Sequence, residues 1–140
     1  MQKSLKLDEA SLSYFESPEA AGAKVSGDAD ELRAAFSNLL DNAVKYSDEE
    51  VTVSVELAAI GEKRVAVKVA DKGIGIPNAQ LKRIFKRFYR VPGLFMARVK
   101  GTGLGLFIVR SVVEKHGGRV FAESGGWGQG STFTIQLPRV

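Results

Sequence analysis

The stretch from Val51 to Pro77 reads VTVSVELAAIGEKRVAVKVADKGIGIP and carries a clear strand pattern. Apolar residues alternate with polar ones over residues 51–57, and valine alternates with other residues again over residues 65–69. Such alternation is typical of a strand that has one face in the core. With Gly61 in the turn between the two runs, the stretch predicts a β-hairpin with one solvent-exposed face.

Helical periodicity flanks this hairpin on both sides. Asp28 and Glu31 resemble a capping box, and the apolar residues after them recur at helical spacing, which predicts a helix to about residue 46. Two further helices are predicted at residues 78–88, directly after a proline, and at residues 104–115, directly before a histidine and two glycines.

The two ends of the chain differ in what they contribute to the predicted sheet. Residues 119–123 and 132–137 form a last strand pair, whereas residues 1–27 are irregular apart from one short strand near residues 5–7. The pattern predicts an α+β fold, a two-layer α/β sandwich with helices packed on one face of a mixed, mainly antiparallel sheet. We expect a single domain over residues 1–140.

Composition excludes several classes of site. The 140 residues include no cysteine and one histidine, His116, which excludes disulfides, cysteine-ligated zinc and multi-histidine metal sites. No apolar run approaches the ~18 residues that span a bilayer, and the N-terminus lacks a signal-type apolar segment. We therefore expect a soluble, cytoplasmic chain. Its net charge of +4 suits an anionic partner.

The first predicted helix carries three polar residues on one side. Asn38, Asn42 and Lys45 share a narrow arc beside the apolar stripe, with Tyr46 at its edge. An asparagine carbonyl can join the oxygen ligands of Mg²⁺, and a lysine can offset phosphate charge. The alternative is an ordinary solvated helix face.

An acidic residue and two glycines follow the second strand of the hairpin. Asp71 is placed at the end of the strand, and Gly73 and Gly75 lie where the chain must turn tightly. A buried carboxylate would accept a hydrogen bond from the N6 amine of adenine and would repel the O6 oxygen of guanine. The alternative is an ordinary strand-to-helix turn in which Asp71 is a cap.

A second glycine-rich segment precedes the apolar helix and can present consecutive backbone N–H groups to an anion such as phosphate. Its spacing matches neither a P-loop nor a dinucleotide-binding motif, so by itself it is a weak signal. The segment comprises Lys100, Gly101, Thr102, Gly103, Leu104, Gly105 and Leu106.

Taken together and in order, these segments resemble the ATP-binding catalytic domain of sensor histidine kinases, a member of the GHKL ATPase superfamily. The resemblance covers about residues 25–140, leaving residues 1–24 as a weakly informative lead-in. It rests on four motifs in the family's order: an asparagine box at residues 38–47, a first glycine box at 71–77, a phenylalanine box at 85–88 and a second glycine box at 101–106.

The resemblance implies ATP and Mg²⁺ as cofactors and assigns catalytic residues. Asn42 would be the main Mg²⁺ ligand with Asn38 beside it, and Lys45 and Arg90 would approach the phosphates. Tyr46 would contact the base or sugar, and Asp71 would accept a hydrogen bond from the adenine amine. Gly73, Gly75 and Ile76 would shape the base pocket. Residues 100–106 would fold around the phosphates.

The implied chemistry is transfer of the γ-phosphoryl group of ATP to a histidine, where positioning and charge neutralisation supply most of the catalysis. The histidine would lie on a dimerisation domain absent from this chain, in the parent protein or in trans, and a response regulator would act downstream. His116 is expected to cap its helix and compensate the dipole. The apolar residues within 92–99 predict contact with another domain or copy. No nucleic-acid partner is expected.

Three other functions stay open at this stage. Related ATPases of the chaperone, gyrase and mismatch-repair kind place a glutamate as general base where this chain has Asn38, and an amide cannot take a proton from water. A serine kinase of the anti-sigma type differs only in its acceptor. A pure ATP-sensing module is disfavoured by the four intact motifs.

Overall fold

The computed structural model describes residues 12–47, 51–87, 89 and 105–140. Its elements, in chain order, are β1 (Leu12–Glu16), the 3-10 turn η1 (Pro18–Ala20), α2 (Ala29–Lys45), β2 (Val53–Ile60), β3 (Arg64–Asp71), the 3-10 turns η2 (Asn78–Gln80) and η3 (Arg83–Phe85), α4 (Gly105–Lys115), β4 (Arg119–Glu123) and β5 (Ser131–Pro138).

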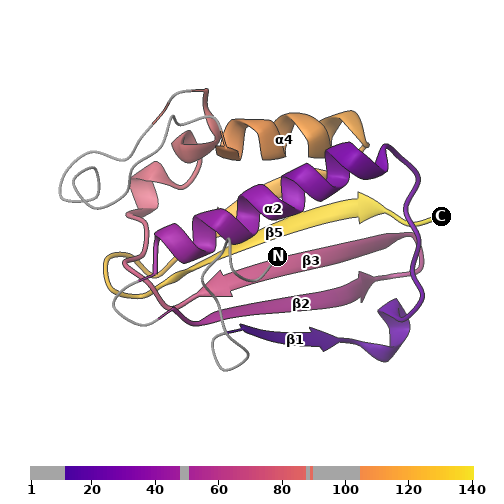
Figure 1. Ribbon diagram of the computed structural model, residues 1–140, viewed down its shortest axis with the longest axis horizontal. Helices are drawn as coiled ribbons and strands as arrows, with labels where there is room; N and C mark the ends of the chain where they lie inside the picture. Colours follow the sequence, from indigo (N-terminus) through magenta and orange to yellow (C-terminus); the bar gives the residue numbers. More distant parts are fainter. Residues whose placement is uncertain (1–11, 48–50, 88, 90–104) are drawn as a thin grey trace.

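The five strands form one sheet in the order β1-β2-β3-β5-β4. β1 pairs with β2 in parallel, and the other three pairs are antiparallel. Figure 1 shows α2 and α4 side by side on one face of this sheet. The predicted two-layer α+β sandwich with a mixed, mainly antiparallel sheet is therefore confirmed.

The helices form where capping and apolar spacing predicted them. Asp28 is the N-cap of α2, and its Oδ1 accepts a 3.0 Å hydrogen bond from the backbone N–H of Glu31. The buried stripe of α2 consists of Leu32, Ala35, Leu39 and Ala43, and that of α4 of Leu106, Val109 and Val113. Both stripes pack on strand residues that include Val69, Phe133 and Ile135. The two helices run antiparallel in Figure 1.

One strand was missed by the sequence pattern. Residues 12–16 were predicted to be irregular, but they form β1 at the edge of the sheet. Four of its five residues are exposed, so the alternation that marks a half-buried strand is absent. Tertiary pairing with β2 makes this segment a strand. The strand predicted near residues 5–7 lies outside the described residues.

The helix predicted over residues 78–88 is wrong. The chain instead forms the two short 3-10 turns η2 and η3, and Lys86 returns to extended backbone with ψ of 146°. A segment of this length is too short to sustain a helix without strong packing. Here Ile84 and Phe85 are buried, and the phenylalanine ring lies edge-to-face against Phe133 with centroids 6.0 Å apart.

Within the part of the chain that the structure describes, no helix combines the length and apolar character needed to cross a membrane.

Candidate functional site

The carboxyl end of α2 and the loop after β3 lie at one end of the helix layer, and α4 begins toward the same end (Figure 1). The backbone N–H of Ile74 donates to the carbonyl of Tyr46 at 3.0 Å, which ties the loop to the end of α2. The amide oxygen of Asn38 lies 3.5 Å from the position that a Cβ on Gly105 would take. The asparagine box, the first glycine box and the start of α4 are thus neighbours.

Asp71 ends β3 as predicted, and only 5% of it is exposed. Its Oδ1 accepts a 2.9 Å hydrogen bond from the backbone N–H of Gly73, and its Oδ2 accepts a 2.8 Å bond from the hydroxyl of Ser131. Burial raises the pKa of this carboxyl, while the hydrogen bonds from Ser131 and Gly73 lower it. Each oxygen retains lone-pair capacity for a further donor.

The sequence pattern did not single out Ser131, because the predicted last strand begins at residue 132. The register of the sheet places Ser131 directly opposite Asp71, so the two side chains meet although they are 60 residues apart. A signal for it existed only in the pairing of β3 with β5. Because one sequence does not reveal which strands pair, the serine could not be singled out.

The two glycines of the first glycine box are required by close approaches of the backbone. A Cβ on Gly73 would overlap the carbonyl of Tyr46. Gly75 has a φ of +79°, and a Cβ there would overlap the carbonyl of Gly126. The loop is therefore clamped between the end of α2 and residues 124–130.

Hydrogen bonds also join the first glycine box to residues 124–130. The backbone N–H of Gly128 donates to the carbonyl of Ile74 at 2.8 Å, and that of Ile76 donates to the hydroxyl of Ser124 at 3.0 Å. The Ser124 hydroxyl in turn donates to the carbonyl of Gly130 at 2.6 Å. The side chain of Ile76 is fully buried in the core, which anchors the loop.

On the polar arc of α2, the amide oxygen of Asn38 lies beside the start of α4. Asn38 and Asn42 are half-buried and Lys45 is exposed. Tyr46 is the C-cap of α2 and packs partly against the core. The Nδ2 atom of Asn42 is buried and has no hydrogen-bond partner among the described residues. An unpaired buried amide costs free energy unless a ligand uses it.

The second glycine box is described only at its end. Gly105 begins α4, and Leu106 is buried in the core, so this leucine offers a ligand its backbone alone. The predicted contacts of Arg90 and of residues 100–104, and the apolar segment 92–99, lie outside the described residues. Nearby, the guanidinium of Arg87 lies over the ring of Phe107, 5.1 Å from its centroid, and links the phenylalanine box to the first turn of α4.

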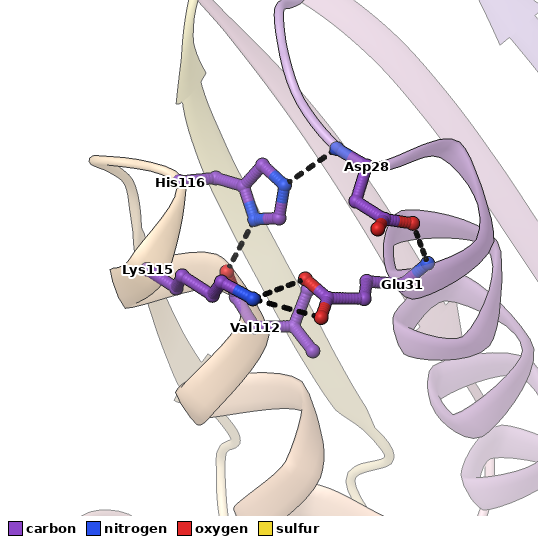
Figure 2. A network of polar contacts seen from close by, with 5 residues as sticks. All are labelled: Asp28, Glu31, Val112, Lys115 and His116. Atoms are coloured by element: carbon purple, nitrogen blue, oxygen red, sulfur yellow. Dashed lines mark hydrogen bonds and ion pairs between the residues drawn. The ribbon is translucent and has the colours of Figure 1, made fainter.

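His116 lies at the opposite end of α4 from these residues (Figure 2). Its Nδ1 bonds to the carbonyl of Val112 at 2.7 Å, which confirms the predicted cap. Its Nε2 accepts the backbone N–H of Asp28 at 3.0 Å, a partner that the sequence did not suggest. A ring that donates at Nδ1 and accepts at Nε2 satisfies both partners, and compensation of the helix dipole stays a prediction.

Comparison with known families identifies the family of this fold. The family model described as "Histidine kinase-, DNA gyrase B-, and HSP90-like ATPase" matches residues 27–140, and the chain belongs to this family of nucleotide-binding domains.

Among curated relatives, the chain is similar to the sensor protein kinase WalK of Staphylococcus saprophyticus, with 42% identity over 113 residues. It is also similar to the sensor histidine kinase WalK of Bacillus subtilis, with 40% identity over 113 residues. Each alignment covers 79% of this chain and 18% of the relative. The chain thus spans less than a fifth of the length of these relatives.

Two solved structures illustrate the similarity of the fold. The mycobacterial sensor histidine kinase MprB matches with a TM-score of 0.79 and 33% identity, over 91% of this chain and 80% of that one. Full-length ShkA in complex with AMPPNP matches with a TM-score of 0.73 and 30% identity, over 94% of this chain and 26% of that one.

Proposed function

We propose that this chain is the ATP-binding catalytic domain of a two-component sensor histidine kinase. It binds MgATP and transfers the γ-phosphoryl group to a histidine on a separate dimerisation domain, in the parent protein or in trans, for relay to a response regulator. The observation that carries the proposal is Asp71, a buried carboxylate held by Ser131 and Gly73 beside a loop that only glycine permits. The family match and the kinase relatives support it.

Asp71 selects the base. Both of its oxygens already accept one hydrogen bond from the protein, which orients the carboxylate, and either can accept a second from the N6 amine of adenine. Guanine presents its O6 acceptor at the same position. Two acceptors with no proton between them repel, so the site discriminates against GTP.

The polar arc of α2 and the start of α4 receive the phosphates. Asn38 and Asn42 offer amide oxygens. The unpaired buried Nδ2 of Asn42 would donate to a phosphate oxygen, whereas a turn of the planar amide would present its oxygen to a hydrated cation. Bound Mg²⁺ would neutralise charge on the phosphates. Lys45 and the first N–H groups of α4, which follow Gly105, add positive potential.

Phosphoryl transfer is favoured over hydrolysis by Asn38. The residue is half-buried beside Gly105 and has an amide where the related ATPases have a glutamate base. An amide cannot take a proton from water. Rapid hydrolysis would need another base, and phosphoryl transfer to a histidine needs positioning and charge neutralisation.

Calorimetric titration tests the proposal. The purified chain is titrated with ATP, with GTP, and with ATP in the presence of excess chelator. We expect saturable binding of ATP that magnesium strengthens, and little binding of GTP. Equal affinity for ATP and GTP would contradict the role of Asp71, and absence of ATP binding would contradict the proposed function.

A further inference from the structure

Two non-covalent contacts join the N-terminal end of α2 to the C-terminal end of α4 (Figure 2). In one, Nε2 of His116 accepts the backbone N–H of Asp28, the N-cap of α2, at 3.0 Å. In the other, Nζ of Lys115 contacts both carboxylate oxygens of Glu31, at 2.8 and 3.0 Å. Both links join segments more than 80 residues apart in the chain.

The partners of His116 determine its protonation state. A backbone N–H can only donate and a carbonyl can only accept, so the ring must accept at Nε2 from Asp28 and donate at Nδ1 to Val112. Only the neutral tautomer with its proton on Nδ1 satisfies both. A second proton would place an N–H of the ring against the N–H of Asp28 and break the link between the helices.

The cross-linked end faces away from the candidate nucleotide site along two rigid elements. Asp28 precedes Asn38 by ten residues, and His116 follows Gly105 by eleven, which at 1.5 Å per residue is about 15 Å along each helix. At the site end, Asn38 and Gly105 are again neighbours. Between these ends the two helices contact each other and share one core, so the contact at the far end is one of those that set their relative position.

We propose that His116 is a positioning residue for the nucleotide site, whose neutral ring ties α2 to α4 and whose protonation releases the tie. The inference rests on the proposed function for its effect on nucleotide binding. It adds a proton-dependent control that acts from the opposite end of the helix layer, through Asn38 and Gly105.

The surroundings of the ring allow this release. A Cβ on Gly27 would overlap the imidazole, so the ring is held tightly on that side. The ring also lines a small open cavity of about 140 Å³, together with residues that include Ser26, Leu137 and Val140. A protonated ring that turns away from Asp28 has space to enter.

The charges around the ring do not restore the tie. At the start of α2 these are the carboxylates of Asp28 and Glu31, and on α4 the ammonium of Lys115. The carboxylate of Asp28 already caps the N–H of Glu31, and that of Glu31 holds Lys115. An imidazolium drawn to either one would weaken the cap or the second cross-link.

The experiment compares the wild-type chain with His116→Gln and Lys115→Gln. Glutamine keeps an acceptor near the position of Nε2 but does not titrate, and Lys115→Gln removes the exposed ion pair while leaving the ring intact. MgATP affinity is measured by calorimetry at pH 7.5 and pH 5.5. Protonation of Asp71 and of ATP itself affects all three proteins equally, so it does not contribute to the difference between them in the pH-dependent loss of MgATP affinity.

We expect the wild type and Lys115→Gln to lose about fivefold more affinity than His116→Gln between the two pH values. Parallel losses in the wild type and His116→Gln would overturn the inference while leaving the proposed function intact. Absence of binding by the wild type at pH 7.5 would instead overturn the proposed function.

A measurement on the wild type needs no variant. ¹⁵N NMR of the labelled imidazole reports its tautomer, and the amide resonance of Gly105 reports the site end. We expect a proton on Nδ1 at pH 7.5 and a Gly105 shift that titrates together with the ring. A proton on Nε2 at pH 7.5, or a Gly105 resonance that ignores the titration of the ring, would overturn the inference.

Discussion

The hydroxyl of Ser131 donates a 2.8 Å hydrogen bond to Oδ2 of Asp71, from a residue 60 positions away in the sequence. The two residues face each other in the register of β3 and β5. Since the N–H of Gly73 holds Oδ1, the carboxylate is fixed from two sides before any ligand arrives. Such preorganisation is what an acceptor needs to select one base over another.

Replacing Asp71 with asparagine is expected to weaken ATP binding by about 1.5 to 3 kcal/mol, because it removes a charged acceptor from the adenine amine. Isothermal titration calorimetry measures the loss. Lys72→Ala is a matched control, since Lys72 is exposed next to Asp71. Equal affinity in Asp71→Asn and the wild type would mean that the base pocket lies elsewhere.

Asp71→Asn is also expected to change how the free energy of unfolding depends on pH. Burial raises the pKa of Asp71, so its contribution to stability is present below the ordinary pKa and is lost as pH rises through the folded pKa. At pH 7 the ionised carboxylate therefore opposes folding. Urea unfolding should find Asp71→Asn at least as stable as the wild type at pH 7. A variant markedly less stable at that pH would contradict this sign.

Ser131→Ala is expected to lower the free energy of unfolding by about 1 to 3 kcal/mol at pH 7, because it leaves a buried charge with one donor fewer. The loss should shrink at low pH, where Asp71 is neutral. Urea unfolding at several pH values measures it, and Ser131→Thr, which keeps the hydroxyl, should recover most of the stability. A loss independent of pH would indicate a packing effect alone.

Gly73→Ala is expected to destabilise the fold by roughly 1 to 3 kcal/mol, since its methyl group would overlap the carbonyl of Tyr46. Gly105→Ala is the control: the nearest atom to its methyl group is the Asn38 amide oxygen at 3.5 Å, an ordinary contact. We expect it to change stability by less than about 0.5 kcal/mol. Thermal unfolding compares the two. Equal losses of stability in Gly73→Ala and Gly105→Ala would mean that overlap with the carbonyl of Tyr46 is not the cause.

Asn42→Ala should leave stability unchanged or raise it by up to about 1 kcal/mol, because it removes a buried amide nitrogen that lacks a partner. The same variant is expected to lose the magnesium-dependent part of ATP binding. Calorimetry with and without chelator separates the two effects. Asp41→Ala, at an exposed neighbouring position, is the control. Retained magnesium dependence would remove Asn42 from the proposed ligand set.

Features that depend on residues close together in the sequence could be predicted, and features that depend on residues far apart could not. The boundaries of α2 and α4, the hairpin β2–β3 and the position of Asp71 follow from periodicity, capping and turn residues that lie within a few positions. β1 and the turns η2 and η3 were predicted wrongly. An exposed edge strand has no distinctive pattern, and a short amphipathic segment adopts whichever conformation lets its apolar residues pack.

The class of fold and the order of its motifs could be predicted from the sequence, because helix and strand periodicity are local properties of the chain. The hydrogen bond from Ser131 to Asp71 and the contact of His116 with the N-cap of α2 became visible only in the folded structure. Both contacts depend on which strands pair and on how two helices lie side by side. The free energy that sets those arrangements comes from burying the shared core, to which residues far apart in the chain contribute together.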